Sequence, residues 1–385
     1  MQADSLVIRL SAFRCLRLLF GGQQVTEGVN RRGILCYNGE MYRNTEDTME
    51  PYYYNQMNKI QQNVYQSMKI GLSALSPSFP APRLDGRELT DIFFKLRLDC
   101  PEIFYAVGFR YRFYPDAANV EIIPEYLFDK GKVKEHQKAM TARVAKLVRP
   151  AQNMDEWEKE QYIHDFICGN VRYDKLKKAY SHEIIGPLGQ GVGVCEGIAK
   201  TVKILCDALG IWCIIAISDS NPEKKIKYRH AWNVVRLGGK YYQVDVTFDN
   251  SLSRGGTVRY DYLNRDDKNF FRDHEPALYG IPQCSDDDQF YYRKKKISFT
   301  KMEDVAKRAK QAMRKGNPLI FHWRGGYLTR EVLEELLALL QQTAQAGDKH
   351  ARVGLNWPQA VLQVVFEAGT SGEDVVVEKA NEGEE

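Results

Sequence analysis

Apolar positions along the chain predict an N-terminal region built of helices and one hairpin. Between residues 52 and 75 hydrophobic side chains recur every fourth position, at Ile60, Val64, Met68 and Leu72, which is typical of one face of a helix. Further helices are predicted over 86–98, 132–148 and 155–168, the last beginning with Asp155 and Glu158 in a capping-box pattern. Strands are predicted over 103–113 and 120–126, with a turn between them.

The central block, from Ile184 to about Asn250, has a different pattern. A glycine-rich loop over 186–193 leads to Cys195, where apolar residues at helical spacing begin, and Gly210 is expected to end that helix. The apolar run 211–217 predicts a strand. Two more strands follow, one with His230 and one with Asp245, and the pair Gly238–Gly239 between them predicts a hairpin.

The C-terminal part predicts a small α/β unit after a charged linker. Thr300 and Glu303 form a capping-box pattern for a helix reaching Gly316. The remaining elements are a strand over 319–323, a helix over 329–346 and strands over 351–356 and 360–366. We therefore divide the chain into a weakly ordered leader (1–48), a helical and hairpin region (49–150), a core (151–290), a small α/β domain (297–369) and an acidic disordered tail (370–385). Translation is expected to start at Met41 or Met49, where patterned sequence begins.

Composition narrows the function classes. The formal net charge is only +4, which gives no support for a nucleic-acid partner. No apolar run is long enough to span a membrane, and no secretory signal is evident, so a cytoplasmic location is expected. The eight cysteines are scattered without a CxxC pair, which argues against a zinc site and a disulfide framework. A cysteine with a special role is then expected to be a reactive thiol. No cofactor is expected, and the oligomeric state is left open.

Cys195 is placed where a thiol becomes nucleophilic. A thiol attacks a carbonyl only as the thiolate, and the unpaired N–H groups and dipole at a helix N-terminus lower a thiol pKa to about 3.5–7.5. The backbone N–H of Cys195 is also a candidate donor to a developing oxyanion.

Hairpin register relates His230 to Asp245. If the two glycines form the turn, Leu237 pairs with Lys240 and, counting outward, Trp232 pairs with Asp245. His230 then lies on the face of Asp245 as its diagonal neighbour, within reach of one hydrogen bond. Asp245 would fix the tautomer of His230, and His230 would share a proton with Cys195.

Each of these residues alone has an ordinary structural alternative. A cysteine beside glycines is commonly a small buried hydrophobe, and a strand histidine is commonly a packing or surface residue. Tyr173 is a further candidate for lining the cleft, or a half-buried aromatic residue. Trp232 would shield the ion pair from water or only fill the core. Gln190 is a candidate oxyanion donor, or a solvated loop residue.

The central block resembles the core of the transglutaminase-like superfamily, which shares a papain-like fold. The matching stretches are Gly193-Val194-Cys195-Glu196-Gly197-Ile198-Ala199, Arg229-His230-Ala231-Trp232-Asn233 and Gln243-Val244-Asp245-Val246-Thr247-Phe248-Asp249. Asn170-Val171-Arg172-Tyr173-Asp174 and Tyr260-Asp261-Tyr262-Leu263-Asn264 resemble segments that flank this core in bacterial members. The resemblance covers about residues 155–275 and implies Cys195 as nucleophile, His230 as base and Asp245 as orienter. Phe248 stands where many members have tryptophan.

We therefore expect an α+β fold, with a papain-like transglutaminase core between the N-terminal helical and hairpin region and the C-terminal α/β unit. The expected activity is cysteine-dependent acyl transfer on a protein or peptide substrate, attacking peptide or glutamine-type amide carbonyls through a thioester. Hydrolysis is favoured over crosslinking, because no dedicated amine site is evident. The alternatives are a non-catalytic binding or scaffold module that retains the core and, with less support, a zinc protein.

Overall fold

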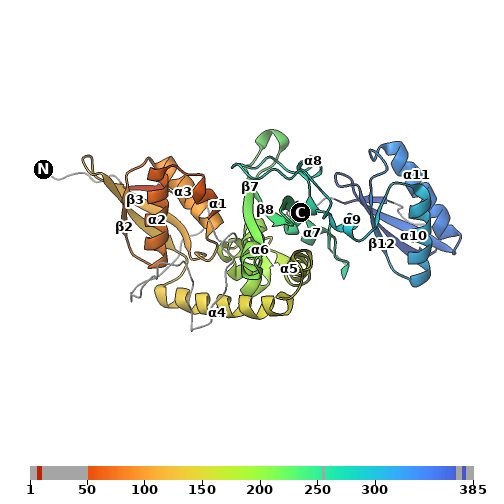
Figure 1. Ribbon diagram of the computed structural model, residues 1–385, viewed down its shortest axis with the longest axis horizontal. Helices are drawn as coiled ribbons and strands as arrows, with labels where there is room; N and C mark the ends of the chain where they lie inside the picture. Colours follow the sequence, from red (N-terminus) through yellow and green to blue (C-terminus); the bar gives the residue numbers. More distant parts are fainter. Residues whose placement is uncertain (1–6, 11–50, 254–255, 370–374, 379–385) are drawn as a thin grey trace. The chain divides into compact units, whose positions relative to one another are not determined.

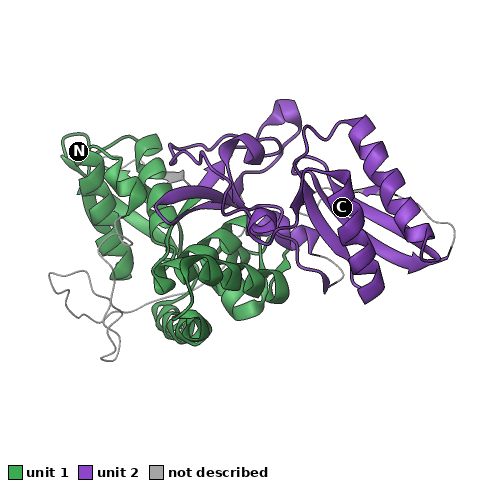
Figure 2. Ribbon diagram, turned by 45° about the vertical axis from the view of Figure 1, so that its right-hand side comes forward, with its two compact units in different colours: residues 1–215 green, residues 216–385 purple. Residues whose placement is uncertain are grey.

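The computed structural model describes residues 7–10, 51–253, 256–369 and 375–378. It divides into two compact units, residues 1–215 and residues 216–385 (Figure 2). Most of the expected leader, including Met41 and Met49, lies outside the described residues. Within that leader, residues 7–10 form strand β1 (Val7–Leu10). The boundary between the units falls within strand β7 (Trp212–Ser218), and the finer division proposed from the sequence stays a prediction.

The first unit begins with a region of helices and an antiparallel sheet, and continues into α5 (Glu156–Asn170), which packs on α6 (Cys195–Leu209) (Figure 1). The helices are α1 (Tyr52–Asn55), α2 (Lys59–Ser73), α3 (Gly86–Asp99), α4 (Lys130–Val148) and α5 (Glu156–Asn170). The sheet has the order β1-β3-β4-β2, with β2 (Phe79–Pro82), β3 (Ala106–Phe113) and β4 (Asn119–Tyr126). The hairpin and the helices predicted over 86–98, 132–148 and 155–168 are confirmed, and Asp155 caps α5 in a complete capping box.

The expected single helix over 52–75 is two helices. Asn58 accepts hydrogen bonds from the backbone of Ile60 and Gln61, a capping box that starts α2 afresh. Val64, Met68 and Leu72 are buried as predicted, whereas Ile60 is 55% exposed. From Ile60 to Leu72 the helix rotates by three full turns and about 120° more. Side chains at a strict four-residue spacing therefore drift around the helix, and Ile60 lies outside the buried face.

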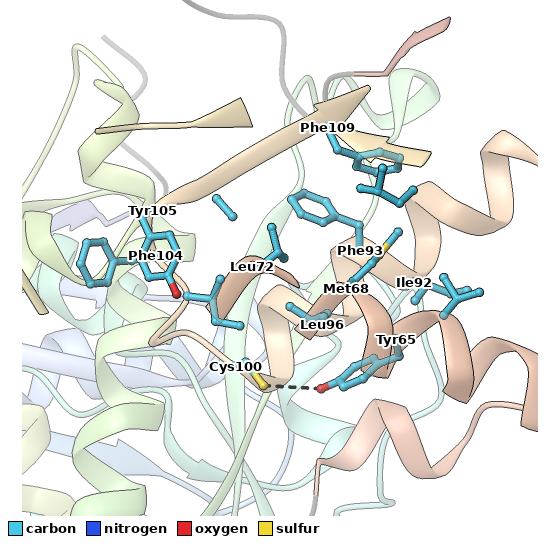
Figure 3. Packing of buried hydrophobic residues seen from close by; sticks show 14 of the residues in the cluster. Tyr65, Met68, Leu72, Ile92, Phe93, Leu96, Cys100, Phe104, Tyr105 and Phe109 are labelled. Carbon is cyan, nitrogen blue, oxygen red and sulfur yellow. Dashed lines mark hydrogen bonds between the residues drawn. The ribbon is translucent and has the colours of Figure 1, made fainter. Parts of the chain in front are cut away.

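The hydrophobic core of this region continues past residue 150 into the central block. Its buried members run from Met57 to Leu188, and α2 and α3 both contribute to it. Figure 3 labels part of this cluster: Tyr65, Met68, Leu72, Ile92, Phe93, Leu96, Cys100, Phe104, Tyr105 and Phe109. The helical and hairpin region and the start of the central block therefore share one core.

The end of the first unit carries the segment expected to hold the nucleophile. The expected glycine-rich loop is instead a π-helical turn, Gly186–Gln190, which has Pro187 near its start and ends at Gly191 in the left-handed region. Strands β5 (Arg172–Tyr173) and β6 (Val192–Gly193) pair in parallel, and β6 leads into helix α6 (Cys195–Leu209). Gly210 ends α6 with a φ of 75°, as predicted.

The second unit contains the predicted hairpin. The sheet order is β10-β9-β8-β7, with β8 (His230–Leu237), β9 (Lys240–Val244) and β10 (Leu263–Arg265). The ladder runs from the pair Leu237–Lys240 to the pair Asn233–Val244, which confirms the predicted register. The expectation that Asp245 lies within a strand is wrong, because Asp245 instead caps helix α7 (Val246–Leu252). Two short helices follow, α8 (Asp267–Phe270) and α9 (Tyr291–Lys294).

The C-terminal part of this unit is an α/β layer. Its sheet has the order β11-β12-β14-β13-β15, with β11 (Ser298–Phe299), β12 (Leu319–Trp323), β13 (Lys349–Asn356), β14 (Val361–Ala368) and β15 (Val375–Val377). Helices α10 (Met302–Lys315) and α11 (Arg330–Gln345) pack on each other and on the sheet (Figure 1).

Two expectations for this C-terminal part are corrected. The capping box at Thr300 is wrong, since strand β11 reaches Phe299 and the uncapped helix α10 begins only after Lys301. Residues 375–377, within the expected disordered tail, form a strand parallel to β13. Among the described residues, no helix combines the length and apolarity needed to cross a membrane. None of the six cysteines within the described residues forms a disulfide.

Candidate active site

Cys195 is the first residue of α6, at the N-terminus of a helix of 15 residues. Its side chain belongs to the buried set, with 7% exposure for the residue. The preceding residue, Val194, is the N-cap and offers no side-chain hydrogen bond to the first turn. The backbone N–H groups of that turn therefore supply the partial positive charge that favours an anion at Cys195.

A buried ion network fixes the start of α6. The Lys200 Nζ lies 2.8 Å from carboxylate oxygens of both Glu183 and Glu196, and Arg97 pairs with the same two acids. Burial alone would raise the pKa of Glu196, yet the charges of Lys200 and Arg97 lower it well below its ordinary value. Two cations and two anions thus balance in a network that includes Glu196, the residue that follows Cys195.

His230 and Asp245 form the first pair of the candidate site. The His230 Nε2 lies 2.5 Å from the Asp245 Oδ2, a charge-assisted hydrogen bond between the first residue of β8 and the N-cap of α7. The imidazole of His230 is 12% exposed and the carboxylate of Asp245 is fully buried. Because a carboxylate only accepts hydrogen bonds, the Nε2 of His230 carries a proton that it donates to Asp245.

Asp245 also accepts hydrogen bonds from Phe248 and His274. Its Oδ1 accepts the backbone N–H of Phe248 at 2.9 Å, which caps α7, and its Oδ2 also accepts from the Nε2 of His274 at 2.9 Å. Burial alone would raise the pKa of Asp245. The charge and hydrogen bond of His230, together with His274, lower that pKa well below its ordinary value instead. The carboxylate is therefore ionised and fixed in orientation.

His274 is the residue that sequence reasoning missed. It lies in a loop after α8, and its only sequence signal is its position among Phe270, Phe271 and Asp273. Its side chain is fully buried, and its Nδ1 lies 2.9 Å from the Oδ1 of Asp273. One histidine of seven, 29 residues beyond Asp245, carries no spacing from which this contact could have been predicted.

Aromatic rings enclose the two imidazoles. The ring of Trp232 stacks on that of His230 with centroids 6.0 Å apart, and its Nε1 donates to Gln243 at 2.7 Å. The Phe248 ring lies 4.7 Å from that of His230 and 4.5 Å from that of His274. Trp232 is buried in the core beside the imidazole of His230, and its role in shielding the ion pair from water stays a prediction.

The cluster of His230, Asp245 and His274 has the ligand types of a metal site. Its three ligand atoms lie within 4.8 Å of one another, which would suit one ion. However, the Asp245 Oδ2 is 2.5 and 2.9 Å from the two nitrogens. Ligands bound to tetrahedral zinc at 2.0–2.1 Å lie about 3.3 Å apart. The distances fit direct hydrogen bonds and do not fit a shared metal ion.

The remaining predicted site residues lie in the first unit. Tyr173 is half-buried in β5, opposite Gly193 in the parallel pair. Gln190 is exposed at the end of the π-helical turn. The structure thus brings His230, Asp245 and Trp232 together within the second unit. The contact of Cys195 with His230, and the cleft roles of Tyr173 and Gln190, stay predictions.

Comparisons with known proteins identify one family model and some similar solved structures. No curated protein matches the chain. A solved structure described as a TGase is similar at 10% identity and a TM-score of 0.25, covering 59% of this chain and 66% of its own. A candidate cysteine protease from Cytophaga hutchinsonii is similar at 15% identity and a TM-score of 0.25, covering 40% of this chain and 59% of its own. The family model described as the transglutaminase-like superfamily matches residues 141–246, a range that contains Cys195, His230 and Asp245. The chain therefore contains a transglutaminase-like domain over residues 141–246.

Proposed function

We propose that this protein is a cysteine-dependent acyl-transfer enzyme in which Cys195 is the nucleophile, His230 the general base and acid, and Asp245 the orienting carboxylate. The observation that carries the proposal is the hydrogen bond of His230 to a fully buried, ionised Asp245, since that bond fixes the orientation of the imidazole used in the proposed proton transfer. The placement of Cys195 at an uncapped helix N-terminus supports it.

The proposed reaction has two stages. The Cys195 thiolate attacks the amide carbonyl carbon, a C–S bond forms, and backbone N–H groups at the start of α6 stabilise the oxyanion. His230 then donates its proton to the leaving nitrogen, the C–N bond breaks, and a thioester remains. Water, deprotonated by His230, attacks the thioester and releases a carboxylic acid, which restores the thiolate and the protonated imidazole.

Hydrolysis is the favoured second stage. Water is always present, whereas crosslinking needs a site that binds an amine, and no residue described above suggests one. The substrate class is then an amide in a peptide or a glutamine side chain.

The first experiment tests the nucleophile. The folded protein is treated with a limiting amount of iodoacetamide at neutral pH, and the alkylated cysteines are identified by peptide mapping. We expect Cys195 to react about tenfold or more faster than Cys168, a partly exposed thiol beside His164 that serves as the internal control. Equal labelling of the two would contradict the proposed activation of Cys195.

The second experiment tests turnover and the acceptor. Wild type, Cys195→Ala and the control Cys168→Ala are incubated with a peptide pool in ¹⁸O-water, with and without a fluorescent primary amine. We expect wild type and Cys168→Ala to produce ¹⁸O-labelled acids, and Cys195→Ala to produce none. Amine incorporation would instead favour crosslinking. Identical product profiles for all three proteins would favour the non-catalytic scaffold.

A further inference from the structure

His274 makes contacts that a packing residue does not need. It is fully buried, and each of its ring nitrogens faces a carboxylate: Nε2 faces the Oδ2 of Asp245 at 2.9 Å, and Nδ1 faces the Oδ1 of Asp273 at 2.9 Å. Carboxylates only accept hydrogen bonds, so both nitrogens of His274 donate and its ring is an imidazolium cation. Burial alone would lower the pKa of His274, but the hydrogen bonds to Asp245 and Asp273 raise it above its ordinary value.

Asp273 is itself anchored. Its Oδ2 accepts the hydroxyl of Tyr262 at 2.6 Å, and its Oδ1 accepts the amide of Gln359 at 3.1 Å. The ring of His274 also stacks on Phe270 with centroids 3.8 Å apart. The imidazolium is therefore held from both its edge and its face, and it cannot leave Asp245 without breaking several contacts.

The shared oxygen connects this anchor to the proposed base. The Oδ2 of Asp245 accepts from His230 on one side and from His274 on the other, and the two rings have centroids 5.5 Å apart. A cation at that distance offsets part of the negative charge that His230 experiences, because electrostatic interactions in a buried site are weakly screened. Among the described residues, the titratable groups that face His274 are Asp245, Asp273, His230 and Tyr262.

We propose that His274 is a positioning residue that, anchored by Asp273, holds the Asp245 carboxylate in place and sets the proton affinity of His230. This inference rests on the proposed role of His230 as the base. His274 acts only through Asp245 and does not touch the substrate. Its effect is to keep His230 from binding its proton too tightly to donate it to a leaving group.

The experiment measures the titration of His230 directly, without relying on turnover. Full-length protein with ¹⁵N-labelled histidine is titrated by NMR, and the His230 signal is assigned by its loss in His230→Ala. His274→Gln keeps a hydrogen-bond donor near Asp245 but removes the cation. We expect it to raise the proton affinity of His230 by about tenfold, since the charge of Asp245 is then offset less. The alkaline limb of the pH profile for amide cleavage should move in the same direction.

Matched variants separate this role from a structural one. His350→Gln removes another buried imidazole of the same unit, one that bonds to Gln341, and should leave the titration of His230 unchanged. Asp273→Asn keeps the His274 ring and weakens its charge, so it should raise the proton affinity of His230 by a smaller factor. It also keeps the inference testable if His274→Gln fails to fold.

The outcomes distinguish the two proposals. An unchanged His230 titration in both Asp273→Asn and His274→Gln overturns the role of His274, whether or not the wild type cleaves amides. A shifted titration in a protein without thiol-dependent turnover supports the coupling and counts against the proposed function. One equivalent of zinc per chain in the wild type, lost in His274→Gln, would overturn the inference in favour of a metal site.

Discussion

Asp245 serves three hydrogen-bond donors with two oxygens. Its Oδ1 accepts the backbone of Phe248, and its Oδ2 accepts from His230 and His274. Asparagine has nearly the same shape, but one of its two groups is a donor. In Asp245→Asn the amide oxygen would still cap α7, while the amide nitrogen would donate to the two imidazoles and reverse the tautomer of His230.

We therefore expect Asp245→Asn to reduce amide cleavage by on the order of 10⁴-fold, the loss typical when an orienting carboxylate in a triad becomes an amide. Stability should fall as well, by about 3 kcal/mol at neutral pH, because a buried cation at His274 loses one of its partners. Steady-state kinetics and urea unfolding measure the two effects. Asp266→Asn is the control, since Asp266 caps α8 in the same way and should be nearly neutral.

The stability effect has a defined pH dependence. The pKa of Asp245 is lower in the folded protein than its ordinary value, so its contribution to stability is fully present above that ordinary value, about 3.9, and is lost as the pH falls below it. The difference in unfolding free energy between wild type and Asp245→Asn should therefore shrink between about pH 5 and pH 3. A difference that stays constant over this range would contradict an ionised Asp245.

The sequence predicts part of this site because hairpin register is countable. Two glycines set the turn, and counting outward brings His230 beside Asp245, as the hydrogen bond confirms. His274 follows no such rule, since a loop residue reaches its partner only through the complete tertiary fold. The relation of Cys195 to His230 likewise depends on tertiary structure and stays a prediction.

Element boundaries depend on local hydrogen bonds that compete with periodicity. The predicted helices over 86–98 and 329–346 were confirmed within a few residues, because their apolar spacing is strong. The caps at Asn58 and Asp245 were missed, since each lies where an apolar pattern continues on both sides. At Thr300 the pattern was present, but strand pairing of Ser298 and Phe299 took precedence.

The start of α6 gives a prediction at this scale. A Cβ on Gly197 would lie 2.1 Å from the backbone oxygen of Ser181, so the helix that carries Cys195 would have to move. We expect Gly197→Ala to lower the free energy of unfolding by about 1–3 kcal/mol, as overpacking does, and to slow alkylation of Cys195. Urea unfolding and iodoacetamide kinetics provide the measurements.

Gly169→Ala is the matched control for Gly197→Ala. Gly169 is also helical, in α5, and a Cβ there would have nothing within 4 Å. Alanine should stabilise that position by up to about 1 kcal/mol, because glycine loses more backbone entropy on folding. Similar behaviour of the two variants would mean that the contact with Ser181 does not constrain α6.

At the scale of the whole second unit, the C-terminal α/β layer is hydrogen-bonded to residues 261–273, the segment that leads to His274. Asn356 in β13 donates to Asp261 at 2.9 Å and to the hydroxyl of Tyr262 at 3.2 Å, and Gln359 reaches Asp273. Arg259 forms an ion pair with Glu378, the residue after β15. The sequence predicts a separate small domain, because a charged linker precedes the C-terminal α/β layer. The hydrogen bonds that join this layer to residues 259–273 connect distant segments and therefore leave no local sequence pattern.

We expect Asn356→Ala to loosen both segments together. The variant leaves buried acceptors near Tyr262 with one donor fewer, at a cost of about 1–3 kcal/mol. Hydrogen exchange should accelerate in peptides covering 257–275 as well as in β13. Arg352→Ala is the control on the same strand, because Arg352 is exposed and its ion pair with Glu367 contributes little. Faster exchange confined to β13 in Asn356→Ala would indicate an independent domain.

The dual use of Asp245 links folding to reactivity. The same carboxylate that starts helix α7 also orients the His230 ring, so the two arrangements form or dissolve as one event. A chain emerging from synthesis, or one damaged later, would lack an oriented imidazole as long as the first turn of α7 was missing. Under the proposed chemistry, copies that lack the first turn of α7 would have no oriented base and would not cleave amides.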